Sequence, residues 1–280
     1  MRQEKFISGH KTINKESKGA ITAFLKKEEH YNHDNHNLLA GYFFMREFMH
    51  EMVKEEKDLS IRGSASLPMY NEPFRVPTDL DLQASSPKQI LELIRHIAAT
   101  EKDAKITLSK VDITRNNVLE AHVAIDLNGF MASFNVDVAP KDCLENETKT
   151  MRKVITTDQV FDAKTISREG AIARKIDCIL NKFNEPHPSY RIKDFHDIYM
   201  LCKDNEVNRA LVGKTLRNII DTEMRHPKDN LKRTRDDIGK LVTPTEDQIE
   251  KHWRKTGMKP NADLSRALEF SKDLVQEMEI

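Results

Sequence analysis

The sequence has little of several features that mark other classes of protein. Its three cysteines, Cys143, Cys178 and Cys202, lie far apart and form no C-x-x-C pair, which favours reduced thiols over a disulfide framework or a catalytic cysteine. No apolar run approaches the length of a membrane span, and the first residues, M-R-Q-E-K-F-I-S-G-H-K, lack the apolar core of a signal peptide. We therefore expect a cytoplasmic protein without membrane contact.

The sequence also has no excess of charge of either sign. Lys and Arg number 45, as do Asp and Glu, so the formal net charge is zero and any attraction to nucleic acid must come from a local patch. One candidate RNA-binding patch lies in the C-terminal half, where Trp253 could stack on a base. Its cations could equally belong to solvated helix faces: Arg225, Lys228, Lys232, Arg233, Arg235, Lys251, Arg254 and Lys255.

Two carboxylates lie close together in the stretch from Leu59 to Gln83. An apolar run ends there in Asp79-Leu80-Asp81-Leu82. In a strand, Asp79 and Asp81 project from one face, while the two leucines point into a core. Carboxylates this close repel each other unless a cation lies between them. Mg²⁺, a hard ion that prefers oxygen ligands, would neutralise that repulsion. By itself, such a pair also occurs on solvated strand faces.

A Gly-Ser turn precedes this acidic strand. Gly63 lets the backbone approach a ligand closely, and exposed N–H groups with the Ser64 hydroxyl suit the oxygens of a phosphate. Together the turn and the acids predict a metal–nucleotide site. The order of strand, Gly-Ser, spacer and D-h-D-h strand (h being apolar) resembles the signature of the polymerase-β-like nucleotidyltransferase superfamily, with a slightly longer spacer than usual.

Local patterns predict an α+β fold. Apolar residues spaced three and four apart indicate helices over 38–57 and 88–100, the second starting at Ser85-Ser86-Pro87, and a shorter helix over 21–30. Strand-like runs follow at 106–114, 121–127 and 131–138, and Asn128-Gly129 between the last two is a hairpin signal. Antiparallel pairing of these runs favours a mixed sheet over a doubly wound parallel one.

The hairpin offers a third acid for the metal site. Asp137 and Asp126 each alternate with apolar neighbours, and we favour Asp137 because it stands further from the turn. Either residue could instead face solvent as an ordinary strand residue. His30, His33 and His36 raise the question of zinc, but the surrounding Asn and Asp residues favour a surface loop.

The chain changes character beyond Pro140. From Thr157 onward the pattern is helical, so we predict an α+β domain over 1–150 and a helical domain over 151–280. One amphipathic helix over 169–183 holds Lys175. The next helix begins near residue 191 and carries Asp194 and Asp197 at i and i+3, hence on one face. Alone, these acids are also typical of a capped helix start.

Four motifs taken in order resemble the AbiEii/AbiGii toxin family. These motifs are R-G-S-A-S-L, T-D-L-D-L, A-R-K-I-D-C-I-L and R-I-K-D-F-H-D-I-Y, and they span about residues 59 to 202. Members are nucleotidyltransferase-like toxins of type IV toxin–antitoxin and abortive-infection systems. Two departures concern the phosphate contacts: Arg62 replaces the usual lysine, and Ser64-Ala65 replaces the usual Gly-Thr.

The resemblance implies an Mg²⁺-dependent enzyme that transfers a nucleotidyl group from an NTP to RNA, with a tRNA 3′ end as acceptor and growth arrest as outcome. A cognate antitoxin is the candidate protein partner. The implied catalytic residues are Asp79, Asp81, Lys175, Asp194 (as base) and Asp197. The implied ligand-binding residues are Arg62, Gly63 and Ser64 for the nucleotide and Asp79, Asp81 and Asp137 for the metal. The alternatives are an antibiotic-modifying nucleotidyltransferase and an inactive interaction protein with the same fold.

Overall fold

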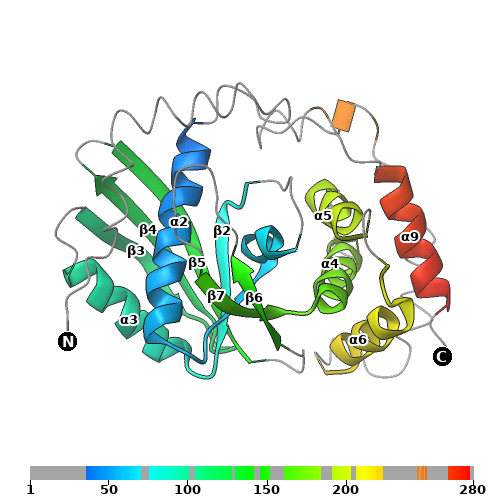
Figure 1. Cartoon of the computed structure of the whole chain (residues 1–280), viewed down its shortest axis with the longest axis horizontal. Helices are drawn as coiled ribbons and strands as arrows, with labels where there is room; N and C mark the ends of the chain where they lie inside the picture. Colours follow the sequence, from blue (N-terminus) through cyan, green and yellow to red (C-terminus); the bar gives the residue numbers. More distant parts are fainter. Residues whose placement is uncertain are drawn as a thin grey trace.

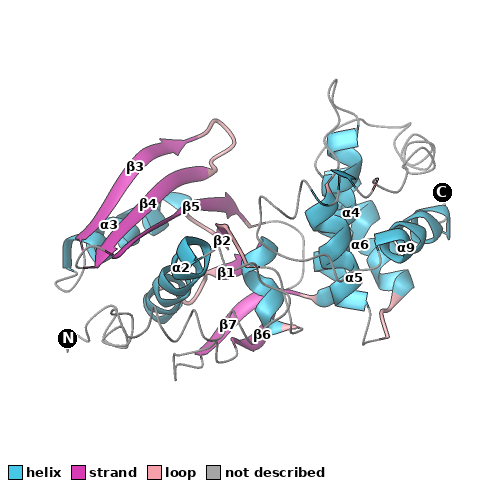
Figure 2. Ribbon diagram, turned by 90° about the horizontal axis from the view of Figure 1, so that it is seen from above, coloured by secondary structure: helices cyan, strands magenta, loops and turns pink. Residues whose placement is uncertain are grey.

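A seven-stranded mixed sheet lies beside a group of helices in the computed structural model of the chain (Figures 1 and 2). The structure describes residues 36–70, 76–100, 105–127, 130–141, 146–151, 161–183, 191–202, 206–222, 245, 247–248, 250 and 264–277. The predicted helix over 21–30 lies outside these residues. In the described part of the chain, no helix is both long and apolar enough to cross a membrane.

The sheet has the strand order β3-β4-β5-β2-β1-β7-β6. Strand β2 runs parallel to β5 and β1 runs parallel to β7, whereas the other neighbours are antiparallel. This confirms the predicted mixed α+β sheet. The strands are β1 (Ser60–Arg62), β2 (Asp79–Ala84), β3 (Lys105–Ile113), β4 (Leu119–Leu127), β5 (Phe130–Pro140), β6 (Asn146–Met151) and β7 (Phe161–Ile166).

Two helices cover the apolar face of the sheet. Helix α2 (His36–Glu55) packs its aromatic and Met stripe on β5, where the Phe48 and Phe134 rings meet edge to face at 5.7 Å. Helix α3 (Pro87–Thr100) buries Ile90, Ile94 and Ile97. Both helices were predicted, and α3 begins at the proline that marked its start. The burial of this face leaves the opposite, polar face of the sheet for ligands.

The predicted hairpin is confirmed by strand register. Strands β4 and β5 pair antiparallel along their length, and Leu127 lies opposite Phe130. A two-residue connection is what an Asn-Gly turn provides. The outermost strand β3 pairs with β4 and is mostly exposed, with an irregularity between Ser109 and Asp112 where Lys110 has a positive φ.

The prediction of helical structure from Thr157 onward is wrong for Phe161–Ile166. This segment is strand β7, in which Phe161, Ala163 and Thr165 are buried and Asp162 and Lys164 between them are exposed. Its sequence F-D-A-K-T-I has the period of two that a half-buried strand requires. Since β7 pairs with β1 and β6, the sheet extends past the predicted domain boundary at residue 150, to Ile166.

Helices follow the sheet from Arg168 onward. Helix α4 packs on α5 and α6, and α9 packs on α5 and α6 (Figure 1). Their shared core includes Ile176, Ile198 and Leu216, all essentially buried. The bounds are α4 (Arg168–Phe183), α5 (Ile192–Cys202), α6 (Arg209–Thr222) and α9 (Leu264–Glu277). This packing brings one face of α4 toward the polar face of the sheet.

Candidate active site

The two predicted acids lie on one face of β2. Asp79 and Asp81 are partly exposed, whereas Leu80 and Leu82 between and after them are buried in the core. The alternation expected of a strand is therefore present. The carboxylates belong to the polar face of the sheet, next to the end of β1.

Gly63 lies directly against the Asp81 carboxylate. Its φ of +60° lies in the left-handed region, and a Cβ built on it would come within 1.8 Å of the Asp81 Oδ2 atom. Only glycine fits both requirements without displacement of the carboxylate. The neighbouring Arg62 is the register partner of Asp81 and donates a hydrogen bond to Gln83. The turn and the acids thus form one unit.

Asp137 is the acid that joins this unit. It is the register partner of Asp81 across the parallel β2–β5 pair, and Glu120 lies opposite it on β4. Asp126 instead pairs with Met131, close to the hairpin turn and far along the strands from Asp137. Of the two candidates for a third acid, Asp137 is therefore the one that lies beside Asp81.

The electrostatics of this acidic group call for a cation. Burial, followed by the charges of Asp81, Glu120 and Asp79, raises the pKa of Asp137 from its usual 3.8 to about 6. Among the described residues no group of three or more His, Cys, Asp or Glu side chains is arranged as a complete metal centre. One or two carboxylates suffice for Mg²⁺ when the phosphates of a substrate supply further oxygens. The residues present fit such a shared site.

Asp79 is held differently from Asp81. Its carboxylate accepts hydrogen bonds from the Asn135 amide at 3.2 Å and from the Thr78 hydroxyl at 3.0 Å. These two donors fix its orientation on the open side of the sheet. Sequence reasoning missed Asn135, although its position two residues before Asp137 on the same strand face could have indicated it.

Helix α4 faces the acids across a cavity of about 710 Å³. Ala171, Arg174 and Lys175 fall at i, i+3 and i+4 on this helix and therefore share the face that lines the cavity. The cavity is lined by Arg62, Gly63, Asp81, Leu82, Gln83, Asn116, Val118, Asp137, Ala139, Pro140, Ile166, Ala171, Arg174 and Lys175. Its volume is typical of a small-molecule site.

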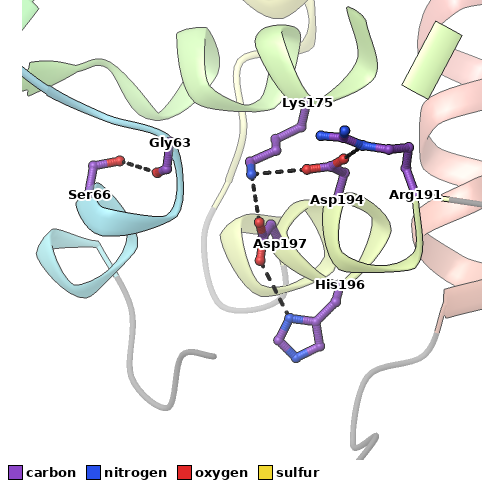
Figure 3. Close-up of polar contacts among 7 residues, drawn as sticks. All are labelled: Gly63, Ser66, Lys175, Arg191, Asp194, His196 and Asp197. Atoms are coloured by element: carbon purple, nitrogen blue, oxygen red, sulfur yellow. Dashed lines mark hydrogen bonds and ion pairs between the residues drawn. The ribbon is translucent and has the colours of Figure 1, made fainter. Parts of the chain in front are cut away.

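Lys175 connects this cavity to an ion cluster between α4 and α5 (Figure 3). Its Nζ atom lies 3.0 Å from Asp194 Oδ1 and 2.7 Å from Asp197 Oδ2. Arg191 donates a second charged hydrogen bond to Asp194, and His196 Nδ1 lies 3.7 Å from Asp197 Oδ1. The predicted motif of two acids on one helix face therefore serves to bind Lys175.

The two acids of this cluster are fully buried. The Asp194 and Asp197 side chains are 0% exposed, whereas Lys175 is 12% exposed. Burial alone would raise the pKa of Asp194, but the charges of Lys175 and Arg191 and the Arg191 hydrogen bond outweigh it and lower the pKa. A buried, paired carboxylate with a lowered pKa is a weak proton acceptor, so this geometry favours a positioning role for Asp194.

Several predicted or relevant residues lie apart from the cavity wall. Ser64 is buried in the short 3₁₀ helix η2 (Gly63–Met69), where Ser66 donates to the Gly63 carbonyl at 2.8 Å. Ser64, Asp79, Asp194 and Asp197 are not among the residues that line the cavity. Conversely, sequence reasoning did not assign Arg174, Gln83 or Asn116 to the site. Arg174 directly precedes Lys175, and its charge was the available signal.

Two sequence hypotheses lie outside the described residues. These are the histidine cluster, of which only the backbone of His36 is described, and the candidate RNA patch with Trp253. The cysteines of helices α4 and α5 are free thiols. Burial, ahead of nearby charges, raises the pKa of Cys178 and also that of Cys202, the latter to about 12, so neither is an activated nucleophile.

A family profile matches residues 48–269, which is most of the chain, and describes the nucleotidyl transferase AbiEii toxin of type IV toxin–antitoxin systems. The chain belongs to this family. Membership of the AbiEii family confirms the resemblance drawn from the four motifs. It makes the protein a nucleotidyltransferase-family toxin.

Two crystal structures of Helicobacter pylori proteins are similar to this AbiEii-family chain at 16% sequence identity. One is JHP933, with a TM-score of 0.50 over 85% of this chain and 91% of that chain. The other is a proposed nucleotidyltransferase, with a TM-score of 0.49 over 85% of this chain and 94% of that chain. The JHP933 likeness concerns the fold alone. No curated protein sequence matches the chain.

Proposed function

We propose that this protein is an Mg²⁺-dependent nucleotidyltransferase that transfers a nucleotidyl group from an NTP to a hydroxyl of RNA. One observation carries the proposal. Asp81 and Asp137 on the sheet face Arg174 and Lys175 on α4 across a single cavity. A triphosphate with its cation needs an acidic and a basic side of the cavity. The acids hold the cation, and the basic side chains bind phosphate oxygens.

Asp79 and Asp81 would hold the Mg²⁺, and Asp137 would lie beside them in the same acidic group. When bound, the ion neutralises the triphosphate and stabilises charge on the attacking and leaving oxygens. The crowding that raises the pKa of Asp137 supports this assignment, because a divalent cation removes the like-charge repulsion. The hydrogen bonds from Asn135 and Thr78 would hold Asp79 ready for the ion.

The remaining wall of the cavity would bind and orient the triphosphate. Lys175 would donate to a phosphate oxygen, and its ammonium is held in place by Asp194 and Asp197. Arg174 would add a second donor from the same face of α4. The backbone at Gly63, where the missing Cβ makes room for the Asp81 carboxylate, would lie against the terminal phosphates.

Family membership supports the finer parts of the proposal. The description of the family as toxins of a type IV toxin–antitoxin system suggests a cognate antitoxin as partner. By the same resemblance, the acceptor is RNA with a tRNA 3′ end as the first candidate, the outcome is growth arrest and the location is the cytoplasm.

The test is to incubate purified protein with Mg²⁺, each α-labelled NTP in turn and total tRNA, with the Asp81→Asn variant as matched control. Label in RNA that depends on Asp81 is the expected result. Label that enters only an aminoglycoside would replace the proposal with a small-molecule nucleotidyltransferase. Nucleotide binding without any transfer would favour an inactive interaction protein. Induced expression of both versions in the same host tests growth arrest.

A further inference from the structure

A chain of hydrogen bonds crosses three strands beside the acidic pair. His122 Nδ1 on β4 lies 3.0 Å from Asn135 Oδ1 on β5, and Asn135 Nδ2 donates to Asp79 Oδ1 on β2 at 3.2 Å. All three side chains lie on the polar face of the sheet, since His122 is the register partner of Asn135 and Asn135 that of Asp79. The chain links an imidazole to a candidate metal ligand.

The donors and acceptors in this chain fix the proton on the ring. An ionised Asp79 can only accept, so the amide of Asn135 must present Nδ2 to it. Asn135 Oδ1 then faces the ring and can only accept, so His122 Nδ1 must carry the proton. In the neutral ring the other nitrogen, Nε2, is left with a lone pair. The strand arrangement therefore creates a base at Nε2.

This base lies outside the cavity, on the Asp79 side of the acidic pair. Asp81 lines the cavity proposed for the nucleotide, whereas Asp79, Asn135 and His122 do not. Asn135 is exposed and His122 is partly exposed, and both neighbour the exposed residues Ser109 and Ser133 of the same sheet face. Because His122 is partly exposed, a substrate outside the cavity can reach its ring. Asp194, in contrast, is fully buried behind Lys175.

We infer that His122 is the general base that accepts the proton of the acceptor hydroxyl. The inference rests on the proposed nucleotidyl transfer. The acceptor oxygen forms a bond to the α-phosphorus, the bond from that phosphorus to the bridging oxygen breaks, and pyrophosphate leaves with the bond electrons. The hydroxyl proton passes to His122 Nε2. Asn135 is a positioning residue, since it orients both the ring and Asp79.

Strand register places charged and polar residues on the same sheet face as His122. Glu120 lies two residues from His122 on β4, Asp137 lies on β5 and Asp79 on β2, while β3 presents Ser109 as the register partner of His122. A cationic ring also stays hydrogen-bonded to Asn135, because Nδ1 donates in both states.

The first test measures transfer by His122→Ala at saturating NTP. We expect the rate to fall about 100-fold, with nucleotide affinity unchanged, and added imidazole to restore part of it. Added imidazole should not raise the rate of the Asp81→Asn variant, because that variant keeps His122. His96→Ala, which removes an exposed histidine of α3 on the other face of the sheet, is the matched control and should keep the full rate. A full rate in His122→Ala, or a loss that imidazole leaves unchanged, overturns the inference.

The second test needs no activity. Ring ¹⁵N shifts of His122, assigned by comparison with His122→Gln, should show the Nδ1-protonated tautomer, which is the rarer form for a free histidine. Asn135→Ala should abolish that preference and slow transfer about 10-fold to 100-fold. An Nε2-protonated ring in the wild-type protein overturns the inference whatever the rates. Wild-type protein that transfers to no acceptor overturns the proposed function and this role with it.

Discussion

Two groups of aspartates in this protein carry the same charge in opposite settings. On the sheet, Asp81 and Asp137 lie side by side with Glu120, and burial together with this crowding raises the pKa of Asp137. Between α4 and α5, Asp194 is more deeply buried, yet its pKa is lowered because Lys175 and Arg191 supply positive charge. The difference lies in the cations and not in burial.

This comparison separates a ligand site from a structural cluster. The helical acids are neutralised within the protein, so they contribute to stability and hold Lys175 in place. For Asp137 on the sheet, burial and the charges of Asp81, Glu120 and Asp79 all act in one direction and raise the pKa. A cluster of acids indicates a metal site only where the positive charges of the protein do not already neutralise it.

Removal of one buried acid gives the largest expected effect on the folded state. Asp194→Asn leaves Lys175 and Arg191 with one counter-charge fewer in a buried cluster, so we expect the free energy of unfolding to fall by about 3–5 kcal/mol. Urea denaturation measures this loss. Asp221→Asn, at an exposed position on α6, is the control and should change stability by less than about 0.5 kcal/mol. If both variants lowered the free energy of unfolding equally, the helical acids would not be neutralised by Lys175 and Arg191.

The same kind of change on the sheet should spare stability and remove activity. Asp81→Asn removes one charge from the metal site and little volume, so nucleotidyl transfer should fall about 1,000-fold or more, equivalent to about 4 kcal/mol in the barrier. In EDTA the thermal midpoint should stay level or rise, because repulsion with Asp137 is relieved. Labelled-NTP transfer and a thermal melt measure the two quantities. A fully active variant would contradict the metal-site assignment.

Gly63 tests how closely the turn and the acids depend on each other. Gly63→Ala places a Cβ 1.8 Å from Asp81 Oδ2 at a left-handed φ, so the carboxylate must shift and the backbone is strained by about 1–2 kcal/mol. We expect about that loss of stability and a roughly 10-fold to 100-fold loss of transfer. The matched control is Gly41→Ala in α2, where a Cβ would meet only the Ser133 carbonyl at 3.5 Å. That change should stabilise the helix by about 0.5–1 kcal/mol.

Local patterns were enough to predict the sheet side of the site. The spacing of Asp79 and Asp81, the Gly63 turn and the hairpin signal are each contained in a few neighbouring residues, and the structure has all of them. Asp137 was preferred to Asp126 by its distance from the turn, and register places it beside Asp81. Strand β7 was missed because its alternating F-D-A-K-T-I segment was taken with the helical region that follows.

Other parts of the site depend on packing between segments that are distant in the sequence, and local patterns could not predict them. The i, i+3 spacing of Asp194 and Asp197 places them on one helix face but does not say whether that face is open or buried. Packing of α5 against α4 closes it around Lys175. The chain from His122 to Asp79 joins three strands that are separate in sequence, so only the sheet order brings its members together.

The smallest expected effect is a pH dependence with opposite sign in the two groups. The pKa of Asp137 is about 6 in the folded protein and 3.8 normally, so the folded state holds more protons between these values and stability falls as the pH rises through that window. Asp137→Asn removes this slope. For Asp194, whose pKa is lowered, the stabilising contribution is present above the normal pKa and is lost as the pH falls.

Denaturation of metal-free Asp137→Asn across pH 3.5 to 8 therefore sharpens the comparison. A full shift of this size corresponds to about 3 kcal/mol, and partial exposure of the carboxylate reduces the expected gain to about 1 kcal/mol above pH 6. The gain should vanish near pH 3.8, where both proteins carry an uncharged group at this position. Addition of Mg²⁺ should reverse the order, since the ion binds more tightly to the protein that keeps all three acids. Parallel pH curves for the two proteins would mean that Asp137 is solvated and does not share charge with Asp81.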